Sequence, residues 1–157
     1  MIDRNKYMHI GDNEFQKPAC YVGNTVYMMM KILLDETMIR EKGTYYLAEY
    51  PWYSTKKWAM TIQKTLSSKR IRTARMWLLR IIAFIGDIVK WVLKVDPPLT
   101  TFRLNNMLTG GEYPINNTKE ICSDLPYDIK KAVFTTAKWM YENNLIKHKP
   151  KVINSEQ

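Results

Sequence analysis

The sequence is poor in the residues on which metal sites and disulfide frameworks depend. Its 157 residues include two cysteines, Cys20 and Cys122, and two histidines, His9 and His148. The cysteines are far apart and form no CxxC pair, which favours reduced thiols in a cytosolic protein. Structural zinc sites have closely spaced ligands, so these four residues predict no zinc site.

Catalytic motifs are also missing. The sequence has no GxxGxxG or GxxxxGK[ST] loop to hold a phosphate after a strand, and no GxSxG or HExxH motif. Cys20 has no histidine positioned to activate it as a nucleophile. The N-terminus carries charges at Asp3, Arg4 and Lys6 without the apolar run of a secretory signal. From the residues alone we expect a cytoplasmic chain that lacks the parts of an enzyme.

What the sequence does contain is typical of a folded domain with an anionic partner. Hydrophobic residues make up 46% and charged residues 25% of the chain. Lysine and arginine number 24 against 15 acidic residues, which gives a formal net charge of +9. Phosphate-bearing small molecules, nucleic acids and membrane surfaces all remain open as partners.

Hydrophobic periodicity and turn residues predict alternating strands and helices, an α/β protein. Strands are expected at Tyr7–Ile10, before a turn at Gly11–Asn13, at Cys20–Val22, and at Thr44–Tyr50 after Gly43. Helices are expected from Val26 to Thr37 with Asn24 as N-cap, and up to Leu66 after a cap at Ser54 or Thr55. A last helix is capped by Asp128 and buries Ile129, Val133, Ala137, Met140 and Tyr141. The tail after Lys147 is expected to fray.

A long helix is predicted from Ala74 to Lys94, ending before Pro97 and Pro98. Four charges interrupt its apolar run and share one face with Ala83: Arg80, Asp87, Lys90 and Lys94. The opposite face is apolar, which indicates an amphipathic helix and not a membrane span. We expect it to pack on its own protein; a membrane interface or a partner protein stays open.

Three stretches of the sequence resemble one family. They are IGDNEFQKPACYVGNTVYMM (10–29), GTYYLAEYPWYSTKKWAMTI (43–62) and DPPLTTFRLNNMLTGGEYPINNTKEICSDLPYDIKKAVFTTAKWMYENNLI (96–146). In order and spacing they are similar to the C-terminal part of extended short-chain dehydrogenase/reductases, the NAD-dependent nucleotide-sugar epimerases and dehydratases. The resemblance implies the last strands of a Rossmann-like sheet in about residues 1–70. It also implies a helical substrate lobe in about 71–150.

The resemblance also implies what this chain does not carry. The family's glycine-rich cofactor loop and its catalytic Tyr-x-x-x-Lys pair lie upstream of these motifs; Tyr27 and Lys31 have that spacing by chance, in another element. We therefore expect a truncated or split enzyme that binds no NAD(P) alone, with a separate chain as a possible source of the other half. Its strands would lack neighbours, which invites aggregation or partner binding.

The resemblance places two cations near the diphosphate of a nucleotide-sugar substrate. Lys17 matches a basic position that is usually arginine in the family, and Arg103 matches a second arginine. Cationic side chains suit a diphosphate, although lysine lacks the bidentate fork of arginine. The plain alternatives are a solvated loop lysine and a surface or helix-capping arginine.

A nucleic-acid site would depend on basic residues around the link after Leu66, with tyrosine and tryptophan nearby. These are Lys64, Lys69, Arg70, Arg72 and Arg75. A solvated charged linker explains the same pattern, and we do not expect a nucleic-acid partner.

Overall fold

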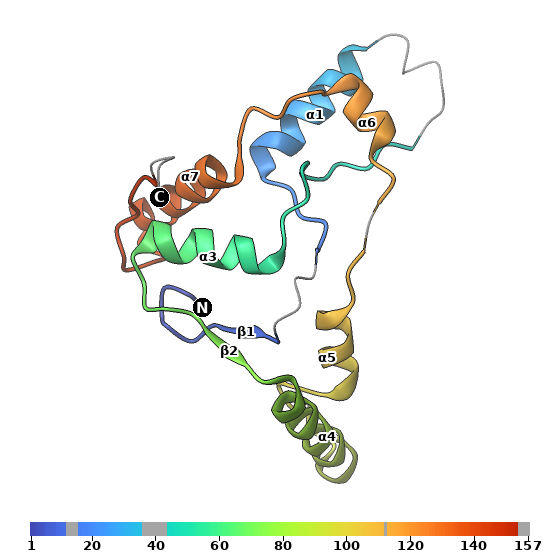
Figure 1. Cartoon of the computed structure of the whole chain (residues 1–157), viewed down its shortest axis with the longest axis vertical. Coiled ribbons are helices and arrows are strands. Elements are labelled where there is room, and N and C mark those ends of the chain that lie inside the picture. The colour runs from blue at the N-terminus through green and yellow to red at the C-terminus, as the bar shows by residue number, and fades with distance from the viewer. Residues whose placement is uncertain (12–15, 36–43, 112, 154–157) are drawn as a thin grey trace.

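The computed structural model describes residues 1–11, 16–35, 44–111 and 113–153 of a mixed α/β protein. In the described residues the order of elements is β1 (Met8–Ile10), α1 (Val22–Leu34), α3 (Thr55–Leu66), β2 (Arg72–Ala74), α4 (Met76–Leu93), α5 (Thr101–Leu108), α6 (Asn116–Ile121) and α7 (Ile129–Glu142). Three pairs bring together elements distant in sequence, α3 with α7, α1 with α6 and β1 with β2, and the consecutive helices α4 and α5 form a fourth pair (Figure 1).

The two strands run parallel, with His9 opposite Thr73. The first strand was predicted within one residue. The second lies in a basic segment without apolar alternation, so nothing local in its sequence predicts it. Parallel sheets are normally covered on both faces, and two short strands are marginal on their own.

The helices α3 and α7 begin as predicted. The Ser54 hydroxyl accepts a hydrogen bond from the Lys57 N–H at 3.1 Å, and the Asp128 carboxylate accepts one from the Lys131 N–H at 2.7 Å. Each cap satisfies a backbone donor that the first helical turn leaves free. The prediction of a buried Tyr141 is wrong, because that ring is exposed at the end of α7.

The region around Asn24 differs from its prediction. Helix α1 begins at Val22, so Asn24 lies inside its first turn and is buried, and Tyr21 is the N-cap. Neither Cys20–Val22 nor Thr44–Tyr50 is a strand, although the Glu49 N–H donates to the Ala19 carbonyl at 3.0 Å. β-propensity needs a neighbouring strand to pair with, and these segments have none among the described residues. The predicted helix end at 36–37, the turn residues 12–13 and Gly43 lie outside the described residues.

Helix α4 packs on the protein through the face opposite to the apolar one. Leu79 and Ala83 are buried in a cluster with Ala74 of β2 and Leu104 of α5. Gly86 lies so close to the Leu99 carbonyl that a side chain there would collide with it. The face with the large apolar side chains is exposed. The expectation that this amphipathic helix packs its apolar face on its own protein is therefore wrong.

The C-terminal segment is anchored, so the prediction that the tail after Lys147 frays is wrong for residues 148–151. The Asp3 carboxylate accepts hydrogen bonds from the Lys147 and His148 N–H groups and lies 2.7 Å from His148 Nδ1. The Lys151 N–H donates to the Thr65 carbonyl at 2.7 Å. Burial of Asp3 opposes its ionisation, but these hydrogen bonds outweigh that effect and lower its pKa.

The surface is large for a protein of this size. The accessible area is 11584 Å², whereas a compact monomer of 18.6 kDa has roughly 8,200 Å². More large apolar side chains are exposed than are buried. The helix and strand pairs therefore share only a small common core.

Candidate functional site

Helix α5 brings the two predicted diphosphate residues to one element. Its N-terminus is formed by Thr100, whose hydroxyl accepts a hydrogen bond from the Arg103 N–H at 3.2 Å. Lys17 reaches the same helix from a segment 89 residues earlier, where its Nζ donates to the Asn106 carbonyl at 3.0 Å. Arg103 is thus a residue of α5, and Lys17 contacts the same helix near its C-terminal end.

Each of these cations is bound to a backbone carbonyl. The Arg103 guanidinium donates to the Pro97 carbonyl at 2.6 Å and is exposed, as is most of α5. Asp96 is close enough to Arg103 to be affected by its charge. The pKa of Asp96 is lowered mainly by the hydrogen bond from Lys90 and to a smaller degree by the charge of Arg103. The two cations thus point to opposite ends of α5, and neither lines one of the two hollows described next.

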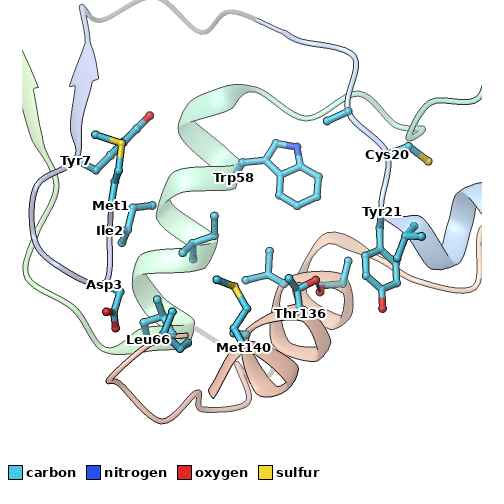
Figure 2. Close-up of a pocket in the computed structure, with 17 residues that line it drawn as sticks. Met1, Ile2, Asp3, Tyr7, Cys20, Tyr21, Trp58, Leu66, Thr136 and Met140 are labelled. Carbon is cyan, nitrogen blue, oxygen red and sulfur yellow. Dashed lines mark hydrogen bonds between the residues drawn. The ribbon is translucent and has the colours of Figure 1, made fainter. Parts of the chain in front are cut away.

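The first of these hollows lies between the N-terminal segment, α3 and α7; we refer to it as the apolar hollow. Figure 2 shows Trp58 of α3 and Met140 of α7 on its walls, with Met1, Ile2 and Tyr7 opposite. Its volume is about 630 Å³. That volume suits a small-molecule site, but its polar side chains do not converge, since Asp3 is already bound to His148. The apolar hollow therefore resembles a group of core side chains that is open to solvent on one side.

The second hollow, the basic hollow, follows β1 and the segment before β2. Its volume is about 1010 Å³, and Lys6, Lys69, Arg70 and Arg72 line it. Three of the five residues of the predicted nucleic-acid site meet there, whereas Lys64 lies on α3 and Arg75 caps α4. The run of cations at 69–72 is visible in the sequence. Lys6 lies beside this run because β1 pairs with β2, which the sequence does not show.

The family's cofactor does not fit the residues at the sheet. In open parallel sheets a dinucleotide binds outside the carboxyl ends of the strands, against glycines that let the phosphates approach. Gly11 follows β1 with φ of +63°, but its N–H donates to the Ala74 carbonyl at 3.1 Å. The Met76 side chain fills the space, with its Cε 2.8 Å from where a Cβ on Gly11 would lie. No step of a reaction can be assigned to NAD(P) at this position.

A buried polar network that the sequence did not reveal surrounds Glu49. This carboxylate is 4% exposed and accepts hydrogen bonds from the Tyr21 N–H at 2.9 Å and from Asn24 Nδ2 at 3.0 Å. Asn24 also exchanges two hydrogen bonds with the backbone of Tyr127. The network ties α1 to the segments before α3 and α7, and its polar groups are paired with one another, which indicates a structural role.

The thiols and histidines are not arranged for chemistry. Burial raises the pKa of both Cys20 and Cys122, so neither is an activated nucleophile. His9 is buried, and neither ring nitrogen has a hydrogen-bond partner among the described residues. The described part of the chain holds no cluster of three or more potential metal ligands.

Comparisons with protein-family models, with curated proteins and with solved structures found no match to this chain. The resemblance to nucleotide-sugar epimerases and dehydratases therefore stays a prediction from the sequence motifs. None of the helices in the described residues combines the length and the apolar character that crossing a membrane requires.

Proposed function

We propose that this chain is the substrate lobe of a nucleotide-sugar epimerase or dehydratase of the extended short-chain dehydrogenase/reductase family. In this proposal it binds the diphosphate of a nucleotide sugar and performs no hydride transfer by itself. One observation carries the proposal: Lys17 and Arg103, which the resemblance assigns to the diphosphate, lie at the two ends of α5 although they come from distant parts of the sequence. Lys17 binds the Asn106 carbonyl of the helix, and Arg103 binds the Pro97 carbonyl just before it.

The contacts of these cations are of a kind that a diphosphate can replace. Both donate to neutral carbonyl oxygens, and hydrogen bonds from a cation to an anionic oxygen are about twice as strong as neutral ones. A small rotation of either side chain would exchange the carbonyl for a phosphate oxygen. The short parallel strands and the apolar hollow suit a lobe that is completed by further strands, from the same polypeptide or a separate chain.

Calorimetric titration of the purified chain tests the proposal. The probes are UDP-glucose, GDP-mannose and dTDP-glucose, with NAD as the comparison ligand. We expect one nucleotide sugar to bind, and Lys17→Ala or Arg103→Ala to weaken that binding by roughly tenfold or more, as loss of a charge-assisted hydrogen bond does. Lys149→Ala, which removes an exposed charge from the C-terminal segment, serves as the matched control.

Two results count against the proposal. One is the absence of measurable binding to all three nucleotide sugars. The other is binding that the Lys17 and Arg103 variants leave equal to that of the Lys149 control. Turnover of a nucleotide sugar by the isolated chain would contradict the part of the proposal that denies it redox chemistry.

A further inference from the structure

Helix α4 presents a broad apolar face to solvent at one extremity of the molecule. Figure 1 shows α4 at the bottom, beyond β2 and α5 and remote from α1, α3 and α7. Ten of its large apolar side chains are exposed: Trp77, Leu78, Ile81, Ile82, Phe84, Ile85, Ile88, Trp91, Val92 and Leu93. The residues of α4 that are buried against the body are Leu79 and the small residues Ala83 and Gly86.

The two tryptophans stand at opposite ends of this face. Trp77 is 58% and Trp91 is 84% exposed. They are separated by close to four helical turns, or about 21 Å, so both project from the same side of α4. Tryptophan at both ends of an apolar face is typical of helices that lie in the boundary between lipid headgroups and acyl chains.

The charges around α4 are strongly one-sided. Residues 69–94 contain seven cations, Lys69, Arg70, Arg72, Arg75, Arg80, Lys90 and Lys94, all of them exposed. The only carboxylate in this stretch is Asp87, and it is turned toward the body, where it accepts hydrogen bonds from the Thr101 N–H at 3.1 and 3.3 Å. Asp96, just after the stretch, pairs with Lys90 at 2.8 Å. The lining of the basic hollow ends at Thr73, shortly before α4 begins at Met76.

We propose that α4 docks on an anionic lipid surface, with its apolar face among the acyl chains and the body of the protein above it. Apolar burial and attraction to anionic headgroups together hold an interfacial helix of this kind, and basic residues next to it add to the attraction. The charges decide this occupant over another protein. Exposed apolar residues also lie on α1, such as Leu33 and Leu34, but α1 itself carries a single cation, Lys31.

Vesicle flotation with the full chain tests this inference. Vesicles of phosphatidylcholine alone are compared with vesicles that also contain phosphatidylglycerol. We expect binding to the anionic vesicles, a decrease with added salt, and a blue shift of tryptophan fluorescence on binding. Trp91→Glu should weaken the binding by roughly tenfold or more, because it puts a charge into the apolar face. Trp139→Glu is the matched control, since it replaces an exposed tryptophan on α7.

Circular dichroism of both variants must show unchanged helix content, which their exposed positions predict. The inference is wrong if the anionic vesicles bind no protein, or if Trp91→Glu and Trp139→Glu bind them equally. It is also wrong if the chain forms a dimer that does not bind vesicles and that Trp91→Glu dissociates. In that case a second copy of the chain covers the apolar face of α4. Nucleotide-sugar binding does not depend on α4 contacting lipid, so the calorimetric titration fails or succeeds separately.

Discussion

Replacing Asn24 by alanine should destabilise the protein more than any exposed substitution. The side chain makes four hydrogen bonds: to both oxygens of Glu49 at 3.0 and 3.2 Å, to the Tyr127 carbonyl at 2.7 Å, and from the Tyr127 N–H at 3.1 Å. Alanine at this position removes the side-chain partners of the Tyr127 N–H and carbonyl. The Glu49 carboxylate then keeps the Tyr21 N–H as its remaining hydrogen-bond donor in this network. Each buried group left unpaired costs about 1–3 kcal/mol, so the free energy of unfolding should fall by about 3–5 kcal/mol.

Urea unfolding followed by circular dichroism measures this change. A loss of that size is a large part of the 5–15 kcal/mol that stabilises typical domains, as an order of magnitude. Asn117→Ala, at an exposed position on α6, is the control and should change stability by less than about 0.5 kcal/mol. Equal unfolding midpoints for the two variants would refute the structural role given to Asn24.

Three further predictions concern packing and pH. Gly86→Ala should destabilise the contact of α4 with Leu99 by about 1–3 kcal/mol in thermal unfolding, whereas Gly111→Ala, with open space around it, should have little effect. Because the pKa of Asp3 is lowered in the folded state, its ionised carboxylate stabilises the fold above about pH 4, and this stabilisation is lost as the pH falls further. The Asp3→Asn variant should therefore lose less stability between about pH 5 and pH 3 than the natural chain. An equal loss for the two proteins contradicts this. Burial raises the pKa of Tyr50 to about 12, so stability should fall as pH rises from about 10 to 12, and Tyr50→Phe should remove the last phenol to ionise in ultraviolet titration.

Local signals in the sequence were sufficient for the starts of two helices. Ser54 and Asp128 cap α3 and α7 in the way that their side chains and the following apolar periodicity predict. Helix α5 was not predicted, although Thr100, a residue type suited to an N-cap, begins it. Helix capping depends on a few adjacent residues, which is why it can be read from sequence.

Contacts between distant segments could not be predicted in the same way. The aromatic run at 44–50 has strand propensity but pairs with no strand in the part of the chain that the structure describes, whereas Arg72–Ala74 is a strand because β1 lies beside it. The sequence also did not predict which face of α4 is turned toward the body. Hydrophobic periodicity identifies an apolar face without showing whether the protein covers it. Of the candidate site, the sequence supplied Lys17 and Arg103, while the contact of Lys17 with α5, the helix that carries Arg103, required the fold.

The central claim is that Lys17 and Arg103 grip a nucleotide diphosphate at α5. Nuclear magnetic resonance of the labelled chain, titrated with the nucleotide sugar that calorimetry selects, tests it most directly. The account predicts that the Arg103 guanidinium signal and the amides of α5 shift together as the ligand is added, and that NAD causes no such change. Shifts confined to Arg70 and Arg72 of the basic hollow, with α5 unchanged, would contradict it.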